Sequence, residues 1–189
     1  MAIAIVPTTP KIQFTYEDYL ELPDDGNRYE LIDGELYMST TPTPNHQFIA
    51  DNFLVALSNY LKKNPIGKVV SAPLEVFFSE TNLAQPDVMF ISKARLNIIK
   101  PAQVKGAPDL VIEVLSPSTE KRDRTVKLKM YARFGVLEYW LPKEKTATVE
   151  IFRLLDGELV PVVRLGKSDV LTSPLFPGLE IPLDEIFNF

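Results

Sequence analysis

The chain has 189 residues, 46% of them hydrophobic and 24% charged, and a formal net charge of −5. This composition is that of a globular protein long enough for one domain with a full core, and the negative charge argues against a protein coated in nucleic-acid-binding surface. The absence of cysteine excludes disulfides and thiolate metal sites.

The sequence gives no support for membrane insertion, secretion or nucleotide-dependent chemistry. No apolar run approaches the roughly 18 residues of a membrane span, and the opening residues, MAIAIVP, lack the basic region and long apolar run of a signal peptide. Neither GxxxxGK(S/T) nor GxGxxG occurs, and Ser116 and Ser118 have no nearby histidine, so we expect no nucleotide cofactor and no serine hydrolase. We therefore expect a cytoplasmic protein without a membrane partner.

Local signals place the secondary structure along one domain. We expect a flexible arm over residues 1–13 and a single domain over residues 14–189, because no long linker, repeat or low-complexity tract divides the chain. Thr15 is typical of a helix N-cap, Asp-Gly at 33–34 of a hairpin turn, and Gly135 of a helix end. In chain order the expected elements are a helix at 16–22, a hairpin at 29–32 and 35–38, a helix at 44–63, strands at 67–71, 74–78, 87–91 and 109–115, a helix from 118 or 119 to 134, a strand at 137–141, a hairpin at 148–154 and 158–163, and a helical turn at 183–187.

Two of the expected strands carry a carboxylate inside an apolar stretch. Asp87 begins the run PDVMFI, and Glu113 lies within DLVIEVL. A buried, unpaired carboxylate is costly, so each needs a cation, a metal or a proton beside it. Two such groups indicate a site for a divalent metal. For either one alone, pairing with Arg or Lys, or a place at a strand end, remains an open alternative.

Strand periodicity orients these carboxylates. Side chains alternate between the two faces of a strand, so Asp109 and Glu113 share a face and Glu113 is expected to project from mid-strand. If the two strands are neighbours, Asp87 and Glu113 converge within reach of one metal ion. Asp109 lies roughly 6.5 Å further along the strand; it either supports the site or caps the entry to the strand.

The helix that follows Glu113 offers a lysine. Asp123, Lys127 and Tyr131 are spaced by four and so share a helical face. A lysine beside a metal and a phosphate can orient water and offset the charge of a pentacovalent phosphorane. The alternative for Lys127 is a helix-surface ion pair with Asp123, and Tyr131 is expected to pack and to form one hydrogen bond.

His46 is the only histidine and opens the long helix. A lone histidine is more often a structural hydrogen-bonding residue than a catalyst. Because the chain has no second histidine and no cysteine, a zinc site is not expected.

Basic residues gather in one segment of this acidic chain. Residues 93–133 contain ten basic and four acidic residues, a local charge of +6. Such a segment beside the carboxylate strands can attract a polyanion such as DNA. The alternative is a solvated helix face.

At these residues the chain resembles the PD-(D/E)XK nuclease superfamily, in which one strand supplies an Asp and the next supplies an acid, a spacer and a Lys. Here Leu115 stands at the Lys position, and Lys127 is the best-placed substitute from the following helix. More narrowly, RYELIDGELYMS, PNHQFIADNFLVAL, QPDVMFIS and GAPDLVIEVLSPSTEKRDRTVKLKMYARFGVLEYWLP are similar to segments of the Uma family of restriction endonuclease-like proteins. The resemblance covers about residues 14–185.

The resemblance implies an α/β fold, with a restriction-endonuclease-like mixed β-sheet flanked by helices and extra hairpins. It implies that Asp87 and Glu113 bind Mg²⁺ or Mn²⁺ and that Lys127 assists the attacking water. Glu30 matches a position that is usually acidic in the family and would be an additional acid at the metal; the alternative is a hairpin-surface Glu facing Arg28.

The function implied is a metal-dependent endonuclease that hydrolyses DNA phosphodiester bonds. We expect the segment 93–133 to contact DNA and a homodimer to present two sites to the duplex. The competing hypothesis is an inactive nuclease-like fold kept for nucleic-acid binding or assembly, motivated by Leu115 at the Lys position and by the net negative charge.

Overall fold

The computed structural model describes residues 13–23, 25–39 and 41–189, so the expected arm lies outside the described residues except for Gln13. The α-helices are α1 (Tyr16–Leu20), α2 (Pro44–Lys63), α3 (Glu120–Arg122), α4 (Leu128–Phe134) and α5 (Leu183–Ile186). A π-helical turn, Asp123–Lys127, joins α3 to α4, and two 3-10 helices span Lys93–Ile98 and Glu144–Thr146. None of the described helices is long and apolar enough to cross a membrane.

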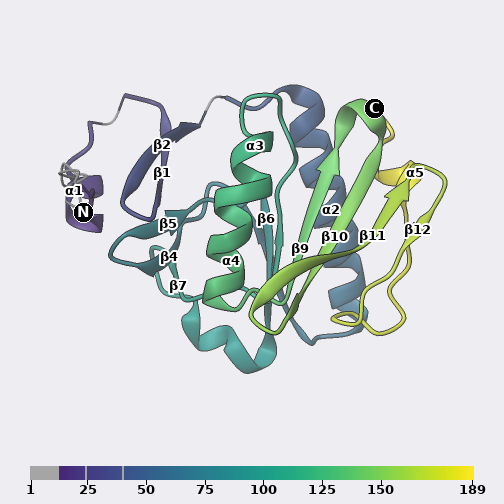
Figure 1. Ribbon diagram of the computed structural model, residues 1–189. Helices are drawn as coiled ribbons and strands as arrows, with labels where there is room; N and C mark the ends of the chain where they lie inside the picture. Colours follow the sequence, from purple (N-terminus) through teal and green to yellow (C-terminus); the bar gives the residue numbers. More distant parts are fainter. Residues whose placement is uncertain (1–12, 24, 40) are drawn as a thin grey trace, which may run out of the picture.

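The strands form two mixed sheets and a small two-stranded one. The strands are β1 (Arg28–Ile32), β2 (Glu35–Ser39), β3 (Gly67–Ser71), β4 (Val76–Ser79), β5 (Asn82–Ala84), β6 (Val88–Ser92), β7 (Val104–Lys105), β8 (Leu110–Ile112), β9 (Glu138–Lys143), β10 (Thr148–Leu155), β11 (Glu158–Gly166), β12 (Val170–Leu171) and β13 (Ile181–Pro182). The main sheet has the order β11-β10-β9-β8-β6-β3, and the second sheet has the order β2-β1-β5-β4-β7 (Figure 1). Only β8–β9 and β4–β7 pair in parallel within these sheets of the described chain. The expected α/β class with a mixed sheet, helices and hairpins is confirmed.

Helices cover both faces of the main sheet (Figure 1). On one face α2 buries a stripe with the period of a helix, including Phe53 and Leu57, against Ile112 of β8 and Trp140 of β9. On the other face α4 packs Tyr131 with residues of β8 and β9. The side chains of β8 therefore alternate between two cores. The same alternation directs Glu113, the residue after β8, toward the face that α4 covers.

The strand that carries the second carboxylate is shorter than expected. β8 ends at Ile112, so the prediction that Glu113 projects from mid-strand is wrong, and Glu113 lies one residue beyond. The strand ends here because the side chain of Asp87 takes the place of a backbone hydrogen-bond acceptor. The ladder between β6 and β8 ends at Val88 and Ile112, and beyond it the Asp87 carboxylate accepts the backbone N–H of Val114 at 2.8 Å.

Other boundaries shifted by a few residues. The strand expected at 74–78 is β4, and β5 and β7 were not expected at all. The helix expected to reach residue 134 does so, but its middle turn is π-helical rather than α-helical. These differences concern short segments whose pairing is decided by distant partners rather than by local periodicity.

Gly67 allows β3 to approach β6, the strand that Asp87 precedes. A Cβ on Gly67 would lie 2.3 Å from the carbonyl oxygen of Ile91 and 2.5 Å from the ring of Phe90. We expect Gly67→Ala to lower the free energy of unfolding by about 1–3 kcal/mol, the usual cost of overpacking. Urea titration would measure it. Gly166→Ala, whose Cβ would meet nothing closer than 3.7 Å, is the control and should change stability by less than about 0.5 kcal/mol.

Candidate active site

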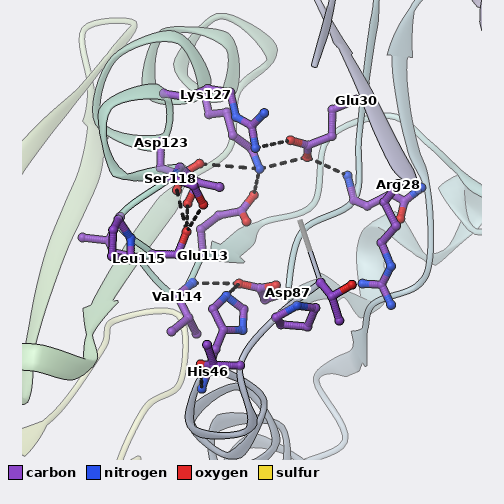
Figure 2. A pocket seen from close by; sticks show the side chains of 18 of the residues that line it. Arg28, Glu30, His46, Asp87, Glu113, Val114, Leu115, Ser118, Asp123 and Lys127 are labelled. Atoms are coloured by element: carbon purple, nitrogen blue, oxygen red, sulfur yellow. Dashed lines mark hydrogen bonds and ion pairs between the residues drawn. The ribbon is translucent and has the colours of Figure 1, made fainter. Parts of the chain in front are cut away.

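A pocket of about 220 Å³ opens where the two sheets meet the start of α2 and of α3. Its lining includes Glu30 of β1, His46 of α2, Asp87 ahead of β6, Glu113 after β8 and Lys127 of the π-helical turn (Figure 2). The structure therefore brings all four predicted catalytic residues to one place, although Glu30 and Lys127 are 97 positions apart in the sequence.

Asp87 is fixed by two neighbours on one of its oxygens. Its Oδ2 accepts the N–H of Val114 at 2.8 Å and lies 3.3 Å from Nε2 of His46. The Asp87 side chain is 19% exposed, so its carboxylate faces the pocket rather than bulk solvent. Burial lowers the pKa of His46, but the hydrogen bond and the charge of Asp87 outweigh burial and raise it above its usual value.

Glu113 and Lys127 form a buried ion pair. Nζ of Lys127 lies 2.5 Å from Oε1 of Glu113, and the Tyr131 hydroxyl donates to the same oxygen at 2.7 Å. Lys127 is 2% exposed, so its alternative as a helix-surface residue is wrong. The expectation that Tyr131 packs and forms one hydrogen bond agrees with these contacts.

The ionisation of this pair reflects burial and crowding of carboxylates. Burial raises the pKa of Glu113; the Lys127 ammonium opposes this rise, and the charge of Asp87 adds to it. Burial lowers the pKa of Lys127, but the carboxylates of Glu113, Glu30 and Asp123 together raise it above its usual value. Lys127 is therefore held as a cation.

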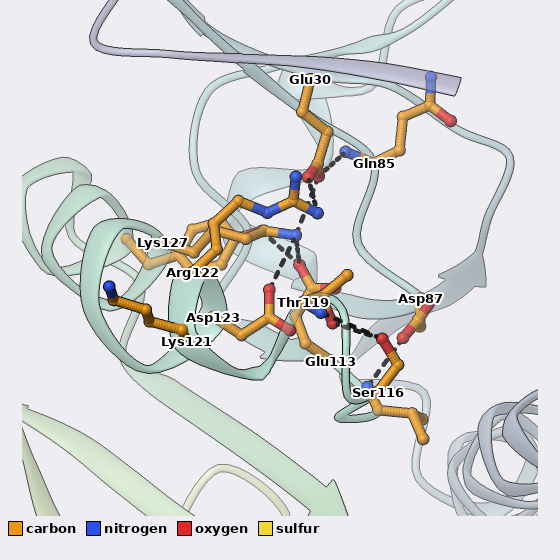
Figure 3. A network of polar contacts seen from close by, with 12 residues as sticks. Glu30, Gln85, Asp87, Glu113, Ser116, Thr119, Lys121, Arg122, Asp123 and Lys127 are labelled. Carbon is orange, nitrogen blue, oxygen red and sulfur yellow. Dashed lines mark hydrogen bonds and ion pairs between the residues drawn. The ribbon is translucent and has the colours of Figure 1, made fainter. Parts of the chain in front are cut away.

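Glu30 is a buried residue that holds two cations. Its Oε1 accepts Nζ of Lys127 at 2.9 Å and the N–H of Gln85 at 3.1 Å, and its Oε2 lies 3.3 Å from a guanidinium nitrogen of Arg122 (Figure 3). The alternative of a hairpin-surface Glu is wrong, since Glu30 is 3% exposed. Glu30 lines the same pocket as Asp87 and Glu113, and its side-chain ion pairs go to Lys127 and Arg122.

Sequence reasoning missed the burial of Asp123 and the participation of Arg122. Asp123 is 2% exposed, and its Oδ1 lies 3.9 Å from Nζ of Lys127. Burial raises the pKa of Asp123, against the opposing charge of Lys127. The spacing of four between Asp123 and Lys127 predicted their shared face, but only the packing of the helix shows that this face is buried.

Asp109 lies outside the pocket lining. Its carboxylate accepts the N–H of Ser92 at 2.7 Å and pairs with Arg95 at 3.3 Å. Of the two roles considered for Asp109, the cap at the entry to the strand is the one that its contacts support.

The electrostatics and the donor set of the pocket fit a divalent cation. The ionisable side chains of the lining include five carboxylates against Arg28, Arg122 and Lys127, a net charge of −2 with His46 neutral. The contacts of Asp87 converge on Oδ2 and those of Glu113 on Oε1, so the second oxygen of each takes no part in them. Within the described residues no three His, Cys, Asp or Glu side chains are arranged to hold a metal by themselves. Mg²⁺ usually takes one or two protein carboxylates and completes its shell with water and phosphate oxygens.

Comparisons with known proteins agree with this fold. The chain is 28% identical over 189 residues to the uncharacterized protein slr1290 of Synechocystis sp. (strain ATCC 27184 / PCC 6803 / Kazusa), and the match spans 98% of this chain and 97% of that protein. It is similar to the crystal structure of a putative nuclease belonging to DUF820 from Anabaena variabilis ATCC 29413, with a TM-score of 0.75 and 20% identity, over 92% of this chain and 97% of the other. The model of the Uma2 family, described as "Putative restriction endonuclease", matches residues 16–184. The chain therefore belongs to the Uma2 family.

Proposed function

We propose that this chain is a divalent-metal-dependent nuclease that hydrolyses phosphodiester bonds in DNA. The observation that carries the proposal is the convergence of Asp87, Glu113 and Lys127 in one pocket with a net negative charge. Two carboxylates can hold a divalent metal, and the metal together with a fixed ammonium would offset the negative charge that develops on the phosphate oxygens and on the leaving oxygen.

Each residue has a distinct task in this proposal. Asp87 and Glu113 would hold Mg²⁺ or Mn²⁺, which when bound supplies a Lewis acid and lowers the pKa of a coordinated water. Lys127 donates hydrogen bonds and carries positive charge toward the phosphate. Because three carboxylates keep Lys127 protonated, it acts as a cation and orients water rather than removing a proton. Glu30 acts as a positioning residue for Lys127, since its oxygens are engaged by Lys127, Gln85 and Arg122.

The superfamily pattern has a lysine where this chain has Leu115, and in the proposed site Lys127 takes the place of that lysine. Leu115 is buried in the core cluster beneath α4, while Nζ of Lys127 reaches the Glu113 carboxylate from the helix. One of the two features that motivated the alternative of an inactive nucleic-acid-binding or assembly protein, the missing lysine at Leu115, therefore has a counterpart in space that supports the catalytic proposal.

DNA contact through the segment 93–133 is part of the proposal. Several of its cations are engaged within the protein: Arg95, Arg122, Arg124, Lys127 and Arg133 all form ion pairs. The exposed cations left to meet phosphates include Lys93, Lys100, Lys105, Lys121 and Lys129. If they do, the logarithm of the DNA-binding constant should fall linearly with the logarithm of salt concentration, with a slope of about −0.9 per contact. A homodimer would double these contacts, and sedimentation would detect it.

The experiment that tests the proposal is cleavage of supercoiled plasmid by the purified protein with Mg²⁺, with Mn²⁺ and with EDTA. Metal-dependent conversion to nicked or linear DNA is the expected result. If neither ion supports cleavage of plasmid although the protein binds DNA, the inactive module is the better description.

Metal binding should also be visible without any substrate. A ligand that binds only the folded state stabilises it by about 2.7 kcal/mol at 100 times its Kd, so saturating Mn²⁺ should raise the Tm of the wild type. Asp87→Asn should abolish that rise. Asp109→Asn is the control, since Asp109 is a carboxylate that is more buried than Asp87 and lies outside the pocket lining, and its Tm should still respond to Mn²⁺.

A further inference from the structure

We propose that Arg28 is a substrate-binding residue at the mouth of the pocket, where its guanidinium holds a phosphate of the DNA backbone without help from a metal. This inference rests on the proposed nuclease function and adds to it a phosphate contact from outside the segment 93–133. Arg28 is an exposed residue of β1 and belongs to the lining of the pocket. Figure 2 shows its side chain extending along one side of the pocket in the direction of Asp87.

The strand that carries Glu30 also places Arg28. Side chains two positions apart in a strand point to the same face, and the carboxylate of Glu30 reaches Lys127 inside the pocket. Arg28 therefore projects from the pocket face of β1, and it is exposed where Glu30 is buried. Its backbone pairs with Ser39 of β2, so the side chain starts from a fixed point in the sheet.

The charge of Arg28 is not used within the described part of the protein. No hydrogen bond or ion pair joins its side chain to another described residue. Every other arginine of the chain forms an ion pair with an acid, and these are Arg95, Arg122, Arg124, Arg133, Arg153 and Arg164. Arg28 is thus the arginine whose charge remains available to a ligand.

The carboxylates of the pocket lining take their contacts from other groups. Lys127 lies against three of them, those of Glu30, Glu113 and Asp123. The remaining two accept hydrogen bonds, Asp87 from the backbone of Val114 and Glu144 from the side chain of Asn45. Arg28 lines a pocket with five carboxylates and pairs with none of them among the described residues. Its position therefore serves an anion that enters from solution.

A phosphodiester is the anion that matches this group and the proposed reaction. The planar fork of a guanidinium can donate two parallel hydrogen bonds to the non-bridging oxygens of a phosphate. The lining has a net charge of −2, which repels a phosphate, and Arg122 and Lys127 are already paired with carboxylates. Among the described residues of the lining, Arg28 is therefore the cation that can receive DNA before a metal offsets the negative charge.

The test measures DNA binding in the absence of metal. A fluorescently labelled DNA duplex is titrated with protein in EDTA at several salt concentrations, and anisotropy reports binding. Arg28→Gln should raise the Kd at least roughly 10-fold, the usual effect of losing hydrogen bonds to a charged group. The slope of log binding constant against log salt should become shallower by about 0.9, the value for one lost phosphate contact.

Arg28→Lys separates charge from geometry. Lysine keeps the positive charge but presents a single ammonium in place of the planar fork. The salt slope should therefore stay at the wild-type value, while part of the affinity is lost. A purely structural role of Arg28 would not change the salt slope in one variant and preserve it in the other.

The matched control is Arg164→Gln, which makes the same change of charge on the far edge strand β11. Its side chain is 58% exposed and lies outside the lining of this pocket. Both the Kd and the salt slope of this variant should equal those of the wild type. Arg28 and Arg164 are both exposed, so neither variant is expected to lose its fold.

The outcomes separate this inference from the function on which it rests. If Arg28→Gln binds the duplex with the Kd and salt slope of Arg164→Gln, the inference is overturned, even where the wild type cleaves plasmid with Mn²⁺. It is also overturned if the wild type does not bind the duplex in EDTA. If Arg28→Gln loses affinity as expected but no metal ion supports cleavage by the wild type, the phosphate contact stands and the nuclease function fails.

Discussion

Glu113→Gln should lower the metal-dependent rate of plasmid nicking by at least about 10²- to 10³-fold, the range typical of losing one preorganised electrostatic group at a reacting centre. The change keeps the size of the side chain but removes the charge that pairs with Lys127 and that is proposed to hold the metal. The measurement is the single-turnover nicking rate at saturating Mn²⁺. Asp87→Asn should give a loss of the same order, because in the proposed site both carboxylates hold the same ion.

The control for both variants is Asp109→Asn, which removes a buried carboxylate that caps a strand entry away from the pocket lining. Its nicking rate should stay within a few-fold of the wild type. Nicking that persists in Glu113→Gln and Asp87→Asn would mean that the activity comes from another site or from a contaminant. Circular dichroism of each variant excludes loss of fold as the cause.

Lys127→Met should lower the free energy of unfolding by about 3–5 kcal/mol, the cost of removing one partner from a buried ionic cluster. Without the ammonium, the carboxylates of Glu113, Glu30 and Asp123 are left crowded, with Arg122 as the cation nearest to Glu30. Urea unfolding at neutral pH would measure the loss.

Two further variants test whether this loss of stability comes from the buried ionic cluster. Lys129→Met changes an exposed lysine two positions along the same helix and should alter stability by less than about 0.5 kcal/mol. Adding Glu113→Gln to Lys127→Met should recover part of the lost stability, because it removes one of the unpaired charges. A Lys127→Met protein as stable as the Lys129→Met protein would show that the carboxylates of the cluster carry protons in the native state.

The sequence was sufficient to identify the candidate residues of the metal site because charged residues are unusual in apolar strands. Asp87 and Glu113 stand in apolar runs where a core strand carries no charge, and Lys127 follows at a helical spacing. The long helix α2 and the two Asp-Gly hairpins were also predictable, since capping and turn residues act over a few positions.

The remaining features depend on contacts that no local pattern encodes. The division of the strands into two sheets, and the end of β8 at Ile112, follow from pairing between distant segments. His46 at the start of α2 contacts Asp87, the residue ahead of β6. The burial of Asp123 and the partial burial of Arg122 follow from the packing of their helix against Glu30, which lies in the other sheet.

The position of Glu30 also has a consequence for the order in which parts of the protein fold. Glu30 belongs to the second sheet, and Lys127, 97 positions later, lies against the main sheet. Contacts of such long range form only after the entropy of a large loop has been lost, so they are late events in refolding. A partly folded chain with an intact main sheet would therefore still lack a completed pocket, and the recovery of nicking after dilution from denaturant should lag behind the recovery of helical signal.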